Sequence, residues 1–366
     1  MSAGIAVEAL TLTVGAFRLQ ELNLAASQGE ILVLLGPNGS GKSVTLETIA
    51  GFHRPDSGRV LINGRDVTAL APEHRNVGFV VQNFGLFPHL TVAQNVAIAR
   101  RADRRRPAAE KAVAVPRDVP GLLDYVGVAP LAERRPQDLS PGEKQRVALA
   151  RTLASAPDLF LFDEPFASLD AEIRDQLREE LLPFLRAFAI PAIFVTHDHS
   201  DAMRLADKVV VLRDGAIVQA GPAADIFTRP ANAFVARFVG VENVLEARVA
   251  EAKGERATLV IGDRKLRAFV PAGSVTAGDA VRVAIRGEQV SLAAVEPRPS
   301  LSAEINRLEG RVISVRRLNP LVTVNIDCGF PLTAYLLAPQ AGAMSIEAGK
   351  SVTVKIAADA VHVMPA

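Results

Sequence analysis

Two patterns of apolar residues divide the chain. In residues 1 to about 235, short continuous apolar runs alternate with segments of helical spacing. Each run has the length of a strand that is buried on both faces, and the runs are Ile31–Leu35, Val77–Val81, Leu159–Phe162, Ile193–Val195 and Val209–Leu212. This alternation is typical of an α/β core with a largely parallel sheet. Within it, we expect a helical subdomain at about residues 84–157.

From about residue 240 onward, apolar and polar residues alternate with a period of two. The clearest runs are 281–285, 322–326 and 352–356, and turns that contain Gly or Pro separate them. This pattern predicts a small all-β barrel or sandwich. Prolines at 297 and 299 divide it into two units, 241–297 and 302–366. Asn243 and Asn306 stand at similar starts of the two units, so the units are either a diverged repeat or alike by chance.

Composition narrows the class of protein. Apolar residues make up 49 % of the 366 residues, enough for a sizeable core, yet no stretch of about eighteen is continuously apolar. The first residues do not have the charged and apolar regions of a signal peptide. Cys328 is the single cysteine and can form no intrachain disulfide. A net charge of +1 gives no electrostatic case for nucleic acid, and the basic run 100–106 reads as a solvated face.

A glycine-rich octapeptide follows the first buried run. It matches GxxxxGK[ST] at every fixed position and consists of Gly36, Pro37, Asn38, Gly39, Ser40, Gly41, Lys42 and Ser43. It lies between a strand and the helical pattern 44–50, as a phosphate-binding loop must. The glycines let backbone N–H groups surround a phosphate, Lys42 places a charge on it, and the Ser43 hydroxyl can ligate Mg²⁺.

Two carboxylates end the apolar run 159–162. Asp163 and Glu164 lie at the carboxyl end of a predicted parallel strand, which is the edge of such a sheet where ligands bind. Asp163 can hold Mg²⁺, and Glu164 can act as general base toward a water. Acidic residues often follow strands, so this motif alone does not identify the chemistry.

Four further motifs resemble those of the ABC (ATP-binding cassette) ATPases. Leu139-Ser-Pro-Gly-Glu-Lys-Gln-Arg146 is similar to the signature motif, with Pro141 in place of the usual glycine. Gln82 resembles the Q-loop glutamine, Ala167-Ser-Leu-Asp170 the D-loop, and His197 the switch histidine. The motifs occur in the order of the family and cover about residues 5–230. The resemblance implies a P-loop α/β fold, a bound ATP and Mg²⁺, and hydrolysis of the ATP.

The resemblance also implies residue roles. Glu164 and His197 would be catalytic; Ser43, Gln82 and Asp163 would hold the metal; and Asp170 would lie at the nucleotide. Ser140 and the amide of Gly142 would face ATP bound by a second cassette, so the chain would form a homodimer or pair with a similar cassette. Pro141 lacks one N–H donor for that contact.

The adenine contact departs from the family. The position at which members place an aromatic residue for stacking is Val14, whose side chain cannot stack. Either Phe17 stacks on the adenine instead, or the adenine packs on aliphatic side chains. Loss of the aromatic contact would cost part of about 0.5–1.5 kcal/mol.

Two regions resemble importers. Residues 82–95 are similar to the segment that receives a helix of the membrane permease, with Phe84, Leu86, Phe87 and Pro88 as the apolar side chains of the groove or of the core. The tail resembles TOBE and Mop domains, which implies molybdate or tungstate as substrate and a regulatory oxyanion on the tail. Sulfate, iron, sugar or polyamine importers are alternatives. The chain would lie at the cytoplasmic face of the membrane and depend indirectly on an extracytoplasmic solute-binding protein.

Two other classes compete with a transport ATPase. One is a soluble ABC protein without a permease, but those usually carry two cassettes or a long coiled-coil insertion, and this chain has neither. The other is a regulatory binding module. The presence of Glu164 and His197 argues against an inactive enzyme.

Overall fold

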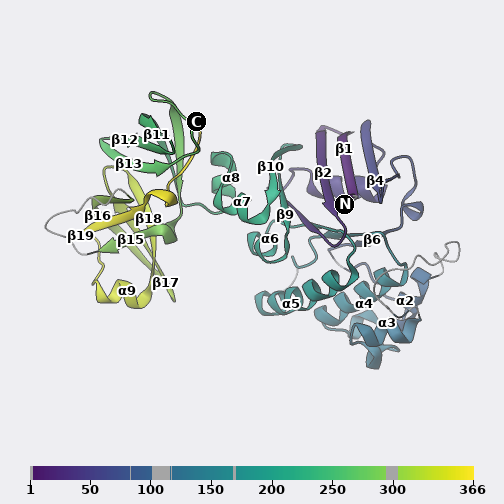
Figure 1. Cartoon of the computed structure of the whole chain (residues 1–366). Helices are drawn as coiled ribbons and strands as arrows, with labels where there is room; N and C mark the ends of the chain where they lie inside the picture. The colour runs from purple at the N-terminus through teal and green to yellow at the C-terminus, as the bar shows by residue number, and fades with distance from the viewer. Residues whose placement is uncertain (1–2, 83, 101–115, 117, 168–169, 294–303) are drawn as a thin grey trace. The chain divides into compact units, whose positions relative to one another are not determined.

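The chain forms two compact units. The computed structural model describes residues 3–82, 84–100, 116, 118–167, 170–293 and 304–366. They divide into Met1–Ala224 and Asp225–Ala366, coloured purple to teal and green to yellow (Figure 1). This boundary precedes the predicted one at residue 235, because α8 (Ala233–Phe238) packs on strands of the second unit. The basic run beyond residue 100, most of the segment 101–120, and the prolines at 297 and 299 lie outside the described residues.

Two sheets build the first unit. The antiparallel sheet has the order β2-β1-β4-β5, with bounds β2 (Phe17–Ser27), β1 (Ala3–Val14), β4 (Ser57–Ile62) and β5 (Arg65–Asp66). The second sheet has the order β10-β9-β3-β8-β7-β6, with bounds β10 (Ala216–Pro222), β9 (Lys208–Arg213), β3 (Ile31–Leu35), β8 (Ala192–Val195), β7 (Leu159–Asp163) and β6 (Val77–Val80). All its neighbours are parallel except β9 and β10, which confirms the predicted parallel core.

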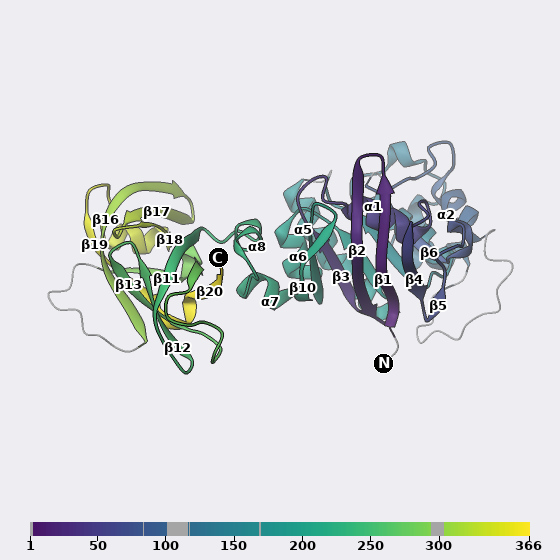
Figure 2. The same cartoon turned by 90° about the horizontal axis from the view of Figure 1, so that it is seen from above.

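Burial explains the continuous apolar runs. Every residue of β3 and β8 is buried, because helices or the other sheet cover both faces of these strands. Side chains of α1 (Lys42–Ala50) share one core with both sheets. Figure 2 labels this helix beside β1 and β2. The antiparallel sheet was not predicted, since its strands lack a continuous apolar run.

Helices make up the rest of the first unit. Their bounds are α2 (Val92–Arg100), α3 (Val119–Tyr125), α4 (Pro141–Ala154), α5 (Ala171–Phe188) and α6 (His199–Leu205), with 3₁₀ turns η1 (Pro72–His74), η2 (Ala129–Leu131) and η3 (Pro136–Asp138). Helix α7 (Ala223–Thr228) contains the boundary between the two units. Helices α2, α3 and α4 contact one another and lie within the predicted helical subdomain (Figure 1).

Two five-stranded antiparallel sheets build the second unit. One has the order β13-β12-β11-β14-β20, with bounds β13 (Arg264–Phe269), β12 (Arg256–Ile261), β11 (Asn243–Lys253), β14 (Ala280–Ile285) and β20 (His362–Pro365). The other has the order β18-β17-β16-β19-β15, with bounds β18 (Pro331–Leu337), β17 (Leu321–Asp327), β16 (Ile305–Leu318), β19 (Ser351–Ala357) and β15 (Val290–Ala293). The unit also holds α9 (Ala338–Ala343), η4 (Gly287–Gln289) and η5 (Ala358–Ala360).

The two orders are the same when β11 is matched to β16 and each following strand to its counterpart. Each sheet, however, takes its last strand from the other half of the sequence: β20 pairs with β14, and β15 pairs with β19. One continuous core joins the sheets. The topology confirms a repeat, and it differs from the predicted pair of consecutive units because each half completes the sheet of the other.

Two buried asparagines occupy matching places in this repeat. Asn243 on β11 donates to the carbonyl of Thr333 on β18 and accepts from its N–H. Asn306 on β16 makes the same pair of bonds with the backbone of Arg267 on β13. Each asparagine therefore joins its own sheet to the opposite one.

Candidate active site

The loop between β3 and α1 surrounds a buried lysine. The Lys42 ammonium donates to the carbonyl oxygens of Gly36 at 2.9 Å and Pro37 at 3.0 Å, and the residue is 5 % exposed. Burial lowers the pKa of Lys42, while the carboxylates of Glu164 and Asp163 oppose that shift. The ammonium of Lys42 is thus bound by carbonyls of the predicted phosphate-binding loop, and it is close enough to Asp163 and Glu164 to feel their charges.

An aromatic ring packs against the same loop. Gly41 has φ 102°, and a Cβ added there would lie 2.7 Å from Cζ of Phe17 and 2.6 Å from Cδ2 of Leu19. Glycine is needed both for the left-handed backbone and for this close approach. Val14 is 39 % exposed and pairs with Phe17 across the β1–β2 turn. Phe17 is therefore an aromatic side chain at the loop, and its role as the adenine contact stays a prediction.

Two of the predicted metal ligands meet. The Ser43 hydroxyl donates to Oδ1 of Asp163 at 3.0 Å, which is close to the spacing of neighbouring oxygen ligands around an octahedral Mg²⁺. Burial raises the pKa of Asp163, with the charges of Glu164 and Glu47 adding to the shift and the Ser43 hydrogen bond opposing it. A cation would offset that burial, so the pair fits Mg²⁺. Gln82 is exposed and, within the described residues, hydrogen-bonds neither Ser43 nor Asp163.

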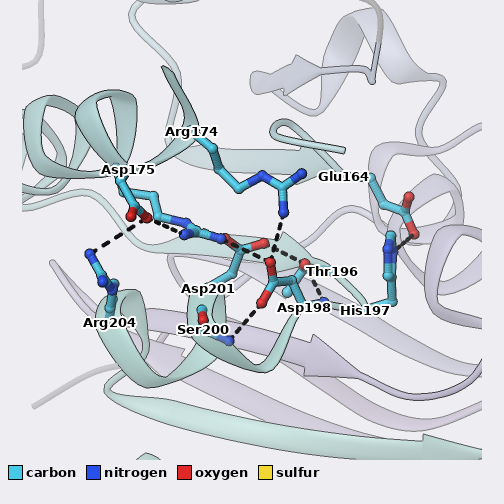
Figure 3. Close-up of polar contacts among 10 residues, drawn as sticks. Glu164, Arg174, Asp175, Thr196, His197, Asp198, Ser200, Asp201 and Arg204 are labelled. Atoms are coloured by element: carbon cyan, nitrogen blue, oxygen red, sulfur yellow. Dashed lines mark hydrogen bonds and ion pairs between the residues drawn. The ribbon is translucent and has the colours of Figure 1, made fainter. Parts of the chain in front are cut away.

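The two predicted catalytic residues are in contact. Nδ1 of His197 lies 3.1 Å from Oε1 of Glu164 (Figure 3). Glu164 has φ 46°, an uncommon backbone conformation for a residue with a side chain, and its N–H donates to the carbonyl of Val195 at 3.0 Å. His197 follows β8 and Glu164 follows β7, and these strands are parallel neighbours. Adjacent strand ends therefore bring together residues 33 positions apart.

The signature motif forms the start of α4. Ser140 is the N-cap: its hydroxyl accepts from the N–H of Glu143, and the Glu143 carboxylate accepts from the N–H of Ser140. Pro141 is the first helical residue, where the N–H has no partner within a helix and proline fits the backbone. Gly142 follows in the first turn. The departure at Pro141 thus removes a donor without disturbing the helix start.

The D-loop motif is partly described. Asp170 is exposed and precedes α5 as its N-cap residue, without a side-chain cap. Residues 168 and 169 lie outside the described residues, so the motif itself stays a prediction.

The segment after Gln82 mixes core and surface. Phe84 is 6 % exposed and belongs to the interior, whereas Phe87 is 40 % exposed. Arg151 of α4 donates to the carbonyls of Phe84 and Gly85, and its guanidinium lies 5.7 Å from the centre of the Phe87 ring. Buried Asn95 bonds both the N–H and the carbonyl of Phe87. Sequence reasoning left open whether Phe84 belongs to the groove or to the core, and it missed Arg151 and Asn95, which hold the segment in place.

Comparison with known proteins decides the family. A family model described as ABC transporter matches residues 19–167. The molybdate/tungstate import ATP-binding protein WtpC of Pyrococcus horikoshii is 37 % identical over 98 % of this chain and 99 % of that protein. The chain belongs to the ATP-binding subunits of ABC importers. This importer ATPase is therefore an enzyme that hydrolyses ATP.

Other relatives differ in the solute that their names give. The spermidine/putrescine import protein PotA of Frankia alni is 39 % identical over 84 % of this chain and 66 % of its own. The sulfate/thiosulfate import protein CysA of Thermosynechococcus vestitus is 42 % identical over 67 % and 72 %. A solved structure, the dimeric post-hydrolysis state of the ATP-binding cassette MJ0796 bound to ADP and Pi, matches 60 % of the importer ATPase and 98 % of that chain, with 27 % identity and a TM-score of 0.50.

Among the described residues, no helix has both the length and the apolar character needed to cross a bilayer.

Proposed function

We propose that the loop 36–43, Glu164 and His197 form the hydrolytic site of this importer ATPase. The contact of Glu164 with His197, next to the loop that holds Lys42, is the observation that carries the proposal. Glu164 accepts a proton from the attacking water, and His197 orients the carboxylate and contacts the γ-phosphate. Lys42 and the loop N–H groups bind the phosphates.

Further groups complete the nucleotide site. Buried Ser40 has a hydroxyl without a hydrogen-bond partner in the described chain, and a phosphate oxygen would satisfy it. Ser43 and Asp163 would hold Mg²⁺, which supplies positive charge that offsets the charge of the phosphates. Gln82 would join them only after its loop moves. Gly36, Pro37, Asn38, Gly39 and Gly41 shape the loop.

The complete site needs two chains in this proposal. Ser140 and Gly142 at the start of α4 would face the γ-phosphate held by a second copy, with Asp170 beside it. The helix start carries a partial positive charge that suits an anion. The dimeric structure of the MJ0796 cassette supports a homodimer.

The surface around Phe87 would receive the permease. Its exposed ring and the backbone held by Arg151 and Asn95 give a firm apolar contact for a helix. The importer ATPase would then lie at the cytoplasmic face of the membrane as a peripheral subunit, with a solute-binding protein on the other side.

An oxyanion such as molybdate or tungstate is the proposed solute. The match to the molybdate/tungstate import protein WtpC extends through the second unit to 98 % of the chain, which supports this choice. Sulfate or a polyamine is the alternative, favoured by the sulfate/thiosulfate and spermidine/putrescine import relatives.

The second unit offers a place for a regulatory oxyanion. A hollow of about 370 Å³ lies on the outer face of β12 and β13, and its lining includes Lys253, Arg256, Arg267 and Thr258. Glu251 pairs with Lys253, so the two arginines supply the excess positive charge. Titration of the full chain with molybdate, tungstate and sulfate by calorimetry tests this site. An absence of heat at millimolar anion, or an unchanged signal in Arg267→Ala, would rule it out.

Replacement of Glu164 tests the hydrolytic proposal. Glu164→Gln keeps the shape of the side chain but removes the base, so we expect turnover to fall by about 10²–10⁴-fold while ATP still binds. Glu179→Gln, an exposed carboxylate of α5, is the matched control and should keep full turnover. Turnover measured by phosphate release, together with ATP binding, separates the two effects. Wild-type turnover in Glu164→Gln would reject the assignment of the base.

Transport is tested in a strain without the gene. Restoration of molybdate accumulation by the wild-type chain, and not by Glu164→Gln, is the expected result. Accumulation of sulfate or spermidine in place of molybdate would favour an alternative solute.

A further inference from the structure

A buried arginine lies in the middle of α5. Arg178 is 4 % exposed, and the other buried residues of this helix are Leu177, Leu181 and Leu185. A charge is costly to bury unless it is paired and hydrogen-bonded, so an arginine on the apolar side of a helix has a specific set of partners.

Three carboxylates share its guanidinium. Nε bonds Asp201, Nη1 bonds Asp175 at 2.7 Å, and Nη2 bonds Asp198 at 3.1 Å. Asp175 and Asp198 have other cationic partners as well, Arg204 and Arg174 respectively (Figure 3). Nη2 also contacts Asp201, so the three guanidinium nitrogens share three carboxylates. A lysine carries its three N–H donors on a single nitrogen, so it lacks the wide planar fork that spans these partners.

These carboxylates hold the backbone on both sides of His197. The Thr196 hydroxyl donates to Asp201 at 2.6 Å and accepts from the N–H of Asp198 at 3.0 Å (Figure 3). Asp198 also caps α6 by accepting from the N–H of Ser200 at 2.7 Å. His197 itself is half exposed, and its side chain contacts Glu164. Its direction is therefore fixed by its two neighbours.

Arg178 also contacts the segment that carries Glu164. Its guanidinium lies 5.8 Å from the centre of the Phe166 ring, and Phe166 is 2 % exposed two positions after Glu164. One side chain thus touches the elements on both sides of the contact between Glu164 and His197.

We propose that Arg178 is a positioning residue for hydrolysis, which holds His197 against Glu164 through Asp198, Asp201 and Thr196. The inference rests on the proposed roles of Glu164 and His197. Arg178 lies eight residues after Asp170, about 12 Å along the helix axis. It therefore connects the end of α5 that faces the second copy in the proposed dimer with the histidine of its own site.

The test separates position from stability. Arg178→Met leaves buried Asp201 without its partner and is expected to destabilise the fold strongly. The double variant Arg178→Met/Asp201→Asn removes both charges together, and the amide oxygen of the new side chain can still accept from Thr196. Arg178→Lys keeps the charge but not the three-way contact. Urea unfolding of each variant records its stability.

Each of these variants is then made in two backgrounds, the wild-type chain and His197→Ala. The kcat of ATP hydrolysis and the Kd for ATP are measured in both. We expect the double variant to lose about 10- to 100-fold in kcat, since a small misplacement of a catalytic group has effects of this size, while the Kd for ATP stays within about twofold. In His197→Ala, measured by single turnover, the same change should cost less than about twofold. Arg178→Lys should recover stability relative to Arg178→Met without recovering kcat.

Arg186→Met is the matched control. Arg186 lies on the same helix and bonds both oxygens of Asp207 at 2.7 Å and the carbonyl of Gly29, not Thr196 or Asp198. It should lower stability and leave kcat unchanged in both backgrounds.

Each other outcome overturns a definite statement. Equal losses of kcat with and without His197, a wild-type kcat in the folded double variant, or a kcat that follows stability across all variants would reject the role of Arg178 alone. Unchanged turnover in His197→Ala would reject the role of the histidine and this inference with it.

Discussion

The two units of this importer ATPase place their polar residues by different rules. In the first unit, strands β3 and β8 are apolar throughout and β7 is apolar up to its last residue, Asp163, so the functional side chains lie at or just after the strand ends. In the second unit, buried and exposed residues alternate along strands such as β17, and polar side chains lie all along the outer faces. Parallel strands end at one edge, so short motifs suffice to assemble a site there. Antiparallel strands turn back at both ends, so what a residue meets depends on the partner strand.

The comparison is tested most strongly by removing β20. Deletion of residues 362–366 removes β20, which belongs to the second repeat in sequence. In the structure it is the edge strand next to β14, in the sheet built mainly from the first repeat. Met364 is 2 % exposed, and its loss with the strand should lower the stability of the second unit by about 4 kcal/mol.

The sequence supplies its own optical reporters for this experiment. There is no Trp and there are two Tyr, Tyr125 in the first unit and Tyr335 in the second. Tyr125→Phe leaves a fluorescence signal from the second unit, and Tyr335→Phe leaves one from the first. Urea unfolding should shift for the deletion in the former background and not in the latter. Deletion of Ala366 alone is the control, and equal midpoints for both deletions would contradict a stabilising role of β20 in the second unit.

The paired asparagines sharpen the comparison next. Asn243→Ala or Asn306→Ala leaves a partly buried backbone N–H and C=O without the asparagine, so we expect each to cost about 1–2 kcal/mol in the second unit. Asn325→Ala, which removes bonds to the hydroxyls of Ser314 and Thr333, is the control and should cost less than about 1 kcal/mol. A small effect at Asn306 with a large one at Asn243 would show that the repeat is not symmetric in energy.

A change of pH tests the shared core of the second unit. Burial, with a contribution from the Asp327 charge, raises the pKa of the Cys328 thiol from about 9 to about 11. The folded chain therefore holds the proton more tightly than the unfolded chain. The stability is complete below pH 9 and falls by about 2 kcal/mol as the pH rises to 11. Urea midpoints of the second unit measured from pH 8 to 11 should show this slope. Cys328→Ala should lose it, and an equal slope in that variant would reject the assignment.

The smallest expected effect concerns the first unit. Pro141→Gly restores the N–H that the signature motif usually has, but it removes the fixed φ at the start of α4. We expect a loss of about 0.5–1 kcal/mol in the first unit. Pro120→Gly at the start of α3 should cost a similar amount and leave turnover unchanged. A change in turnover for Pro141→Gly alone would show that the missing donor matters for ATP.

Sequence reasoning predicted most of the first unit. The apolar runs gave β3, β6, β7, β8 and β9 within a residue or two, and the motif at 36–43 gave the loop before α1. It failed where a side chain can face either way. Phe84 and Phe87 look alike in the sequence, yet Phe84 is buried and Phe87 is exposed. Hydrogen bonds from Arg151 to Phe84 and between Asn95 and Phe87 fix the backbone of the loop.

By itself, the sequence determined the chemistry and the type of each unit. Local spacing sets which residues follow a strand and which face of a strand is apolar, and these are short-range properties. The tertiary structure alone decided which strands pair and which buried charges meet. The alternation of apolar and polar residues in the sequence is the same whether β20 pairs with a strand of its own repeat or with β14 of the other repeat. The one signal for Arg178 was a charge among leucines. Asp175 is its neighbour on the same helix, but Asp198 and Asp201 lie 20 and 23 positions along the chain at the start of another helix.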